Sequence, residues 1–484
     1  MSALTHDIVA KLWNLCNVLK DDGVTYHQYV IELTYLLFLK MAKETQTQNR
    51  LPKGYTWDDL KEKPDLERLE FYKTLLVHLG LQGSAIVKEI YTNANSFVKK
   101  PKTLSTLVEE IDKINWFSVK QEGIGDLYEG LLEKNASEKK SGAGQYFTTR
   151  PLIESIVHVM QPKLEDIIQD PAAGTGGFLI AADRSIRQQS DPSKWTNKQK
   201  EKHQLGTFYG MEHVQDTYRL GLMNLSLHGL DYAMGAAGIH YGDTLSPDHA
   251  VLPKATLMLS NPPFGSKKGG GLPDRPDFPF QTSNKQLCFL QHIYLGLQRG
   301  GRAAVVLPDN VLFEGNTGKQ IRMDLMNKCN LHTILRLPSG IFYAQGVKTN
   351  VLFFTRGETD TNNTKEVWVY DLRAKAPKFN KNTPLTRDYF AGFEQAFGYD
   401  PYGKPSSLKK RISTDEQGRF RKFSRETIAE RNESLDFSWL KDPTQDIPEP
   451  AVIVRDSIVT LESALGNLRS LLVLLGEEPE ETET

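Results

Sequence analysis

An apolar run gives way to a proline-rich turn at residues 255–265, which read ATLMLSNPPFG. The segment Ala255 to Leu259 is short and apolar, which is typical of a buried strand. The Asn-Pro pair that follows indicates a turn. Ligands of open α/β sheets bind beyond the carboxyl ends of the strands. We therefore predict a functional loop here, at the end of a strand in an α/β fold.

The residue types of this turn suit the capture of a planar amino group. The side-chain oxygen of Asn261 and the carbonyl oxygen of Pro262 are both acceptors, and together they could hold the two hydrogens of an exocyclic amine. Pro262 and Pro263 fix φ and have no N–H group. Phe264 offers a flat face on which a base can stack. A plain proline-rich turn with an asparagine cap remains the alternative for these four residues alone.

The composition is that of an ordinary globular protein and sets few limits on function. The 484 residues suffice for two or three domains, and the formal net charge is -1. A basic excess is absent from the sequence, so nucleic-acid binding would need local patches or a partner. Cys16, Cys288 and Cys329 are too far apart for a metal motif. We expect a cytoplasmic protein without a signal peptide, a membrane span or a metal.

Hydrophobic patterns divide the chain into segments of different character. Residues 1–135 carry leucines at helical spacing, and residues 136–144 are polar and glycine-containing, as in a linker. Residues 145–445 alternate between strand-like and helical stretches, which predicts a doubly wound, mostly parallel, Rossmann-like sheet. Residues 450–476 are expected to form a separate helix, and residues 477–484 an acidic, disordered tail.

A glycine-rich turn joins a predicted strand to a predicted helix at residues 164–182. Gly174, Thr175 and Gly176 lie in this turn, where glycine allows tight turning and close approach of a ligand. The turn lacks the Lys-Ser/Thr of a P-loop and the G-x-G-x-x-G spacing, which favours a cofactor without a triphosphate. Asp170 is placed to meet a cationic amino group. Glycine-rich turns without a ligand are common, and that alternative stays open.

Two further acids end the next predicted strands. Glu212 ends residues 207–212, and a carboxylate there can accept from both hydroxyls of a ribose. Asp243 lies near the end of residues 239–244, where it could accept from an adenine amino group. The intervening residues 190–203 are polar and are predicted to be a surface loop. Solvated strand-end acids are the alternative for each position.

A third motif lies at a predicted helix start. Residues 145–150 read QYFTTR and precede Pro151, a residue suited to the first turn of a helix. Amides and hydroxyls at a helix N-terminus could hold a carboxylate. An ordinary helix cap explains the same residues equally well.

The predicted C-terminal helix carries an apolar seam with three- and four-residue spacing. This pattern is typical of a helix that packs against another helix, and we favour a partner protein over packing against the same chain. The seam consists of Ala451, Val454, Ile458, Leu461, Leu465, Leu468, Leu472 and Leu475.

Taken together, the three motifs resemble the modification subunit of type I restriction–modification systems. Proteins of that family are S-adenosylmethionine-dependent DNA adenine methyltransferases. The motifs are QYFTTR at 145–150, DPAAGTGGF at 170–178 and NPPF at 261–264. The cofactor motifs precede the catalytic motif, as in the gamma order of amino-methyltransferases. The resemblance covers most of the chain and makes residues 145–445 the methyltransferase domain.

The resemblance also implies roles for individual residues. It assigns the methionine end of the cofactor to Gln145, Tyr146, Phe147, Thr148, Thr149 and Arg150, although Thr149 stands where the family has proline. It places Gly174, Thr175 and Gly176 beneath the cofactor, Glu212 on its ribose, and Asp170 and Asp243 nearby. The catalytic residues it implies are Asn261, Pro262, Pro263 and Phe264.

The implied reaction is direct methyl transfer to the N6 amino group of an adenine flipped out of duplex DNA. The implied partners are double-stranded DNA, a specificity subunit bound through the C-terminal helix, and a restriction subunit, with two modification subunits in each complex. Methylation of the cytosine amino group, methylation of glutamine side chains in proteins, and a non-catalytic assembly role are the alternatives.

Overall fold

The computed structural model describes residues 3–16, 19, 23–116, 124–138, 148–230, 237–266, 271–342, 347–373, 376–377, 379, 383–413, 418–440 and 450–474. The chain forms two compact units, each described here by itself. The first comprises Met1–Phe147, Gly174–Gly176 and Val214–Tyr241, and the second comprises Thr148–Ala173, Gly177–His213 and Gly242–Thr484.

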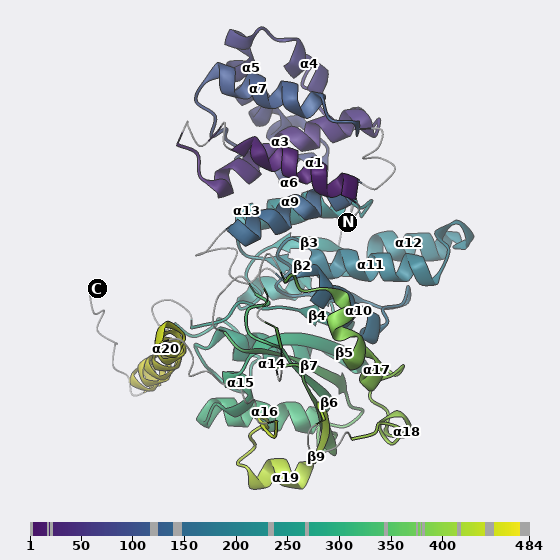
Figure 1. Cartoon of the computed structure of the whole chain (residues 1–484), viewed down its shortest axis with the longest axis vertical. Coiled ribbons are helices and arrows are strands. Elements are labelled where there is room, and N and C mark those ends of the chain that lie inside the picture. Colours follow the sequence, from purple (N-terminus) through teal and green to yellow (C-terminus); the bar gives the residue numbers. More distant parts are fainter. Residues whose placement is uncertain are drawn as a thin grey trace. The chain divides into compact units, whose positions relative to one another are not determined.

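The first unit is largely helical, as expected for the N-terminal part of the chain (Figure 1). Its helices are α1 (Ala3–Asn14), α3 (Tyr26–Glu44), α4 (Trp57–Glu62), α5 (Asp65–Gln82), α6 (Ala85–Tyr91), α7 (Pro101–Asp112), α9 (Ile124–Glu138) and α13 (Gln215–Leu227). In α5, the buried side chains of Leu69, Tyr72, Leu75, Leu76 and Leu79 follow the helical period.

The end of α9 corrects the predicted linker. The helix continues to Glu138, so the first residues of the segment 136–144 are helical rather than extended linker. The rest of that segment lies outside the described residues, as does the predicted acidic tail at 477–484.

Nine strands form one sheet, in the order β3-β2-β1-β4-β5-β7-β6-β8-β9. Their bounds are β1 (Ile168–Asp170), β2 (Phe208–Glu212), β3 (Gly238–Tyr241), β4 (Ala255–Ser260), β5 (Leu297–Pro308), β6 (Cys329–Arg336), β7 (Thr349–Arg356), β8 (Glu366–Asp371) and β9 (Phe420–Ser424). The chain moves outward from β1 in both directions, which is the doubly wound arrangement expected from the alternating pattern.

The sheet is mixed rather than uniformly parallel. Strand β1 pairs in parallel with β2 and β4, and β4 pairs in parallel with β5. Strand β7 is inserted between β5 and β6 and is antiparallel to both. Strand β8 is parallel to β6, and β9 is antiparallel to β8. The predicted sequence motifs therefore follow the ends of strands in the parallel half of the sheet.

Helices of the second unit lie on both faces of the sheet. The described helices of this unit are α10 (Arg150–Met160), α11 (Gly177–Gln189), α12 (Asn197–Gly206), α14 (Lys285–Gly296), α15 (Asn310–Phe313), α16 (Asn316–Lys328), α17 (Ala391–Phe397), α18 (Pro405–Leu408), α19 (Arg425–Glu430) and α20 (Pro450–Leu474). Helix α10 lies on one face of β5, and α14 and α16 lie on the other. The 3-10 turns within the described residues are η1 (Gln48–Arg50) in the first unit, and η2 (Pro192–Lys194), η3 (Pro247–Val251) and η5 (Arg387–Phe390) in the second.

The predicted surface loop at residues 190–203 is wrong. Residues Asn197–Gly206 form α12, which begins with a capping box between Thr196 and Gln199. His203 of this helix is buried, and its Nε2 atom lies 2.6 Å from Oδ1 of Asp183 on α11. The segment has little apolar periodicity because one buried histidine, rather than a leucine stripe, anchors it.

Alternate residues of β5 face opposite sides of the sheet and hold different helices. Ala303, Val305 and Leu307 belong to the apolar core shared with α14 and α16. Arg302 points to the other face, where its Nε donates to the carbonyl of Met160 at the end of α10 (2.9 Å). Its guanidinium also forms two bonds to the carboxylate of Asp166, at 3.1 and 2.9 Å. This buried pair fixes α10 against the sheet.

Within the described ranges, no helix combines the length and apolar character needed to cross a bilayer.

Candidate active site

The asparagine of the predicted catalytic loop is held by a residue of the predicted cofactor clasp. Strand β4 ends at Ser260, and Asn261 follows it with a side chain that is 8% exposed. The Nδ2 group of Asn261 donates to Oγ1 of Thr148 (2.8 Å). Because this bond uses the amide nitrogen, it defines Oδ1 as the acceptor end of the side chain.

The end of the loop is clamped to the start of α14. Gly265 has a φ of +95°, a left-handed conformation that glycine adopts without strain. Its N–H donates to Oε1 of Gln286 (2.9 Å), and its carbonyl accepts from the N–H of Lys285 (2.9 Å). Ser266 forms an antiparallel bridge with Asn284, whose side chain caps α14. These bonds fix the backbone on the carboxyl side of Phe264.

Asp170 ends β1 and is buried, with 2% of its surface exposed. Its Oδ1 accepts from Oγ of Ser260 (2.7 Å) and from the N–H of Ala172 (3.1 Å). Burial, reinforced by the negative charge of Glu212, raises the pKa of the Asp170 carboxyl to about 7. The site therefore holds a carboxyl group whose charge changes near neutral pH.

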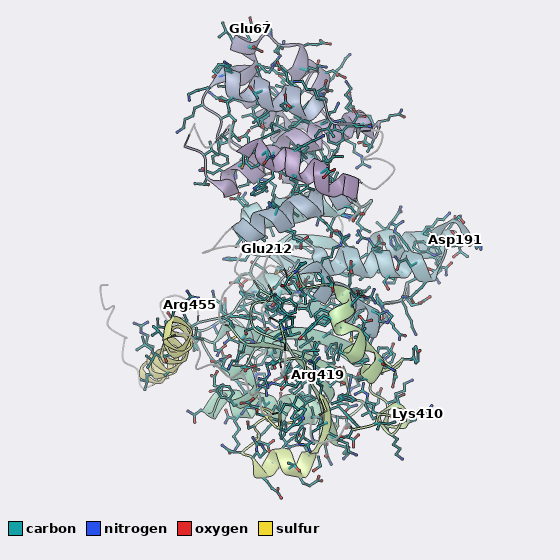
Figure 2. The ribbon with its side chains drawn as sticks, in the orientation of Figure 1. Glu67, Asp191, Glu212, Lys410, Arg419 and Arg455 are labelled. Carbon is teal, nitrogen blue, oxygen red and sulfur yellow. The ribbon has the colours of Figure 1, made fainter. Side chains whose placement is uncertain are left out.

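The other two predicted acids lie where the sequence placed them, at strand ends. Glu212 is the last residue of β2 and is labelled in Figure 2. Asp243 follows β3 by two residues, and its Oδ1 accepts from the N–H of Leu245 (2.8 Å). Asp243 thus helps to shape its own turn, whereas the charge of Glu212 acts on Asp170.

The glycine-rich turn has the backbone geometry that its composition predicts. Gly174 and Gly176 have φ values of +56° and +81°. A Cβ atom at Gly174 would meet no atom within 4 Å, whereas one at Gly176 would lie 3.4 Å from Cδ1 of Ile239 and 3.5 Å from Cγ of Leu225. Gly174 therefore faces open space, and Gly176 faces apolar side chains.

Part of the predicted cofactor clasp is described. Thr149 occupies the N-cap position of α10, without a side-chain capping bond, and has φ -66° and ψ 141°, which are values that proline adopts. Threonine at this position therefore keeps the backbone that the family's proline would impose. Arg150 lies 3.3 Å from Glu154 on the same helix. Gln145, Tyr146 and Phe147 lie outside the described residues.

A buried network that the sequence analysis missed braces the turn after β3. Oγ1 of Thr244 donates to the carbonyl of Pro171 (2.6 Å), and the carbonyl of Thr244 accepts from Nη1 of Arg275 (2.7 Å). Arg275 also contacts Nδ1 of His292 (3.0 Å), and Nε2 of His292 lies 3.2 Å from Oε1 of Gln169. Burial and the positive charge of Arg275 lower the pKa of His292 to about 3. The histidine is therefore neutral and structural.

One group of described side chains has a metal-ligand composition. The ligand atoms of Asp126, Glu129 and His228 all lie within 4.8 Å of one another, on α9 and at the end of α13. The Nδ1 atom of His228 lies 2.8 Å from the carbonyl of Asn224. Nε2 of His228 lies 4.0 Å from Oε2 of Glu129, and a histidine that packs beside carboxylates accounts for this group equally well. None of its residues was predicted as a site residue.

A mixed α/β sheet with Asn-Pro-Pro-Phe beyond its fourth strand defines the class of amino-methyltransferases. The family model of the N-6 DNA methylases matches residues 119–445, and the model of the HsdM N-terminal domain matches residues 8–111. The chain is 47% identical to the methylase subunit of the type I restriction enzyme EcoKI from Escherichia coli strain K12 over 98% of its own length and 96% of that protein.

Solved structures give the same result. A crystal structure of the EcoKI M protein matches with a TM-score of 0.58 and 44% identity, covering 98% of this chain and 97% of that one. A structure from a study of complex assembly and conformational transition in a type I restriction–modification system matches with a TM-score of 0.74 and 25% identity, covering 97% and 98%.

The chain therefore belongs to the modification subunits of type I restriction–modification systems, and it is an adenine-specific DNA methyltransferase. This confirms the family and the substrate base expected from the sequence, in preference to cytosine or a protein glutamine. Membership of a methyltransferase family also implies the use of S-adenosylmethionine.

Proposed function

We propose that Asn261 and Pro262 hold the N6 amino group of the target adenine. The observation that carries the proposal is the bond from Nδ2 of Asn261 to Thr148, which orients Oδ1 as an acceptor. Together with the carbonyl of Pro262, this oxygen would take both amino hydrogens and direct the nitrogen lone pair toward the methyl donor. Holding the reacting atoms in line supplies a large part of such an acceleration.

The described residues fit the cofactor that the family implies. Gly174 leaves open space above the glycine-rich turn, and Asp170 offers a carboxylate for the cationic amino group. We assign the ribose to Glu212, the methionine end to residues 145–150, and the adenine end to Asp243. When bound, S-adenosylmethionine supplies an electrophilic methyl group. In this mechanism no metal and no covalent enzyme intermediate are required.

Phe264 is proposed to stack on the flipped adenine, with Pro263 stiffening the backbone before it. The side chain of Phe264 is only partly buried. The clamp of Gly265 by Gln286 and Lys285 supports this role, because it fixes the position from which the ring projects. Stacking on an aromatic side chain holds a base outside the duplex.

The C-terminal helix is proposed to bind the specificity subunit. Five apolar side chains of α20, the helix that carries Arg455 in Figure 2, are between 47% and 68% exposed. Their three- and four-residue spacing places them on one face of the helix. They are Val454, Ile458, Leu461, Leu465 and Leu468. Leu472 and Leu475 continue the seam in the sequence, but their side chains lie outside the described part of the structure. A stripe of this kind gains stability only when a second apolar surface covers it.

The rest of the proposed assembly follows from the family. We propose two modification subunits for each specificity subunit, joined by a restriction subunit and bound to double-stranded DNA. Since the substrate is the DNA of the cell, we place the complex in the cytoplasm.

The assignment is tested by methyl transfer from labelled S-adenosylmethionine to DNA, using the chain reconstituted with its specificity subunit. Digestion of the DNA to nucleosides should place the label on N6 of adenine. Label on cytosine would contradict the proposed fit of Asn261 and Pro262 to adenine, and label on protein alone would contradict DNA as the substrate.

Cofactor affinity should depend on pH through Asp170. Its pKa of about 7 means that the carboxyl becomes protonated, and loses its attraction for a cationic amine, as the pH falls through 7. We expect affinity for S-adenosylmethionine to fall about tenfold from pH 8 to pH 6, in proportion to the ionised fraction. Asp170→Asn should bind weakly at both pH values. Calorimetry would contradict the assignment if wild type and Asp170→Asn showed the same pH profile; Asp191→Asn, on an exposed turn, is the control.

Substitutions of the two turn glycines should distinguish an effect on cofactor binding from an effect on the stability of the fold. Gly174→Asp projects into open space, and aspartate tolerates the left-handed region, so we expect a folded protein without measurable cofactor binding. Gly176→Asp places a carboxylate against Leu225 and Ile239, so it should also lower the thermal midpoint. Calorimetry and thermal unfolding measure the two effects. Wild-type cofactor affinity in Gly174→Asp would exclude this turn from the cofactor site.

A further inference from the structure

The helix that carries the apolar stripe also has one closely packed position on its other side. Of the α20 residues whose exposure is described, Gly466 alone is buried. It adjoins Leu465, which is 47% exposed on the stripe. Gly466 thus meets its own domain, whereas Glu462 and Val459, one and two turns earlier on the same side of the helix, are exposed.

The contact at Gly466 leaves no room for a side chain. A Cβ atom there would lie 2.5 Å from Oγ of Ser283 and 3.5 Å from Oγ of Ser266. Glycine is unfavourable in the interior of a helix. Gly466 lies within the regular helix Pro450–Leu474, and its φ is outside the left-handed region. The close approach, rather than the backbone conformation, is therefore the reason for glycine at this position.

The two serines belong to the clamp at the end of the catalytic loop. Ser266 comes two residues after Phe264 and bridges to Asn284, the neighbour of Ser283. One residue earlier, Gly265 is bonded to Gln286 and Lys285. The surface on which α20 rests is therefore the same short antiparallel contact that fixes the loop.

We propose that Gly466 is a positioning residue that seats α20 against the clamp and so holds the Asn-Pro-Pro-Phe loop in its reactive geometry. The inference rests on the proposed role of that loop and of the apolar stripe. A partner helix on the stripe would press α20 onto Ser266 and Ser283, which links subunit assembly to the alignment of Asn261.

The geometry sets the size of the expected effect. Ordinary contact with a Cβ atom begins near 3.4 Å, and the Oγ of Ser283 lies at 2.5 Å, so an added methyl group must displace the buried Ser283 hydroxyl, the helix or the clamp. A displacement of about 1 Å at a reacting group can cost roughly a hundredfold in rate. We therefore expect Gly466→Ala to lower kcat by roughly tenfold to a hundredfold. The KM for DNA should change much less.

The test uses the complex with its specificity subunit and three variants. Gly466→Ala introduces the clash. Gly466→Ala with Ser283→Ala removes the clashing hydroxyl and leaves Cβ of Ser283 at 3.8 Å, an ordinary contact. Gly315→Ala is the matched control, because a Cβ atom there would meet nothing within 4 Å. The readouts are kcat, KM, co-elution with the specificity subunit, and hydrogen exchange of residues 261–266.

We expect faster exchange in residues 261–266 and a lower kcat in Gly466→Ala, with both restored in the double variant and unchanged in Gly315→Ala. Wild-type exchange and kcat in Gly466→Ala would overturn the inference, and so would a defect that the serine substitution fails to rescue. Loss of co-elution alone would also overturn it, because it would make Gly466 part of the partner interface. Absence of methyl transfer by the wild-type complex would contradict the proposed function. Hydrogen exchange of residues 261–266 would still test the contact between Gly466 and the clamp in that case.

Discussion

Asn261→Ala is expected to abolish detectable methyl transfer while leaving the fold intact. Removing one hydrogen-bond partner that acts in a transition state typically costs on the order of a hundredfold to a thousandfold in rate. The same change also removes the alignment of the amino nitrogen. Asn261 lies on a loop beyond β4, and its described side-chain bond goes to Thr148 rather than to the apolar core. The measurement is transfer of labelled methyl groups to DNA by the reconstituted complex.

The comparison with Phe264 sharpens this test. Phe264→Ala should cost roughly 1–3 kcal/mol of base stacking and leave measurable activity. Asn197→Ala, an exposed asparagine at the start of α12, should behave as wild type. Thermal unfolding and calorimetry establish that each variant is folded and binds cofactor. Wild-type activity in Asn261→Ala would remove the basis for every role assigned to this loop.

The second large effect is expected at the apolar stripe of α20. Leu465→Glu combined with Leu468→Glu should prevent assembly with the specificity subunit. Burying a leucine side chain contributes about 1.5–3 kcal/mol, so losing two should weaken binding by at least about a hundredfold. Both leucines are exposed, at 47% and 59%, so the isolated chain should keep its fold and cofactor affinity. Co-purification and size-exclusion chromatography measure the loss.

Leu205→Glu provides the matched control for the stripe. Leu205 is 53% exposed on α12, outside the helix proposed to bind the partner. This variant should assemble at the wild-type yield. If the doubly substituted α20 also co-purified at the wild-type yield, the specificity subunit would have to bind elsewhere, and the stripe would need another occupant.

Local patterns in the sequence were sufficient to predict most of the elements that carry the site. An apolar run followed by Asn-Pro predicted the end of β4, and the glycine-rich turn predicted the passage from β1 to α11. These features depend on turn chemistry and on side-chain period, which are properties of neighbouring residues. The same reasoning missed α12, where a capping box and a buried histidine replace a regular apolar stripe.

The direction of strand pairing required the tertiary structure. Strands β5, β6 and β7 are all apolar runs. An apolar run has the same sequence pattern whether the neighbouring strand is parallel or antiparallel to it. Strand β7 lies between β5 and β6 in the sheet, although β6 comes before β7 in the chain. This order depends on how the chain connects the strands in three dimensions. The sequence therefore predicted a mostly parallel α/β sheet, but not that β7 and β9 are its antiparallel strands.

The sequence by itself was enough to predict the chemistry of the site, because residue types and their local spacing indicate a loop suited to an amino group, a glycine-rich turn and strand-end acids. Only the tertiary structure decided how those parts support one another. Thr148 and Asn261 are 113 residues apart in the chain, and Gly466 meets Ser283 across a longer separation. Contacts of this kind leave no local pattern, since they arise when separate elements pack on the same sheet. The raised pKa of Asp170 has the same origin, because the burial that causes it depends on the whole fold.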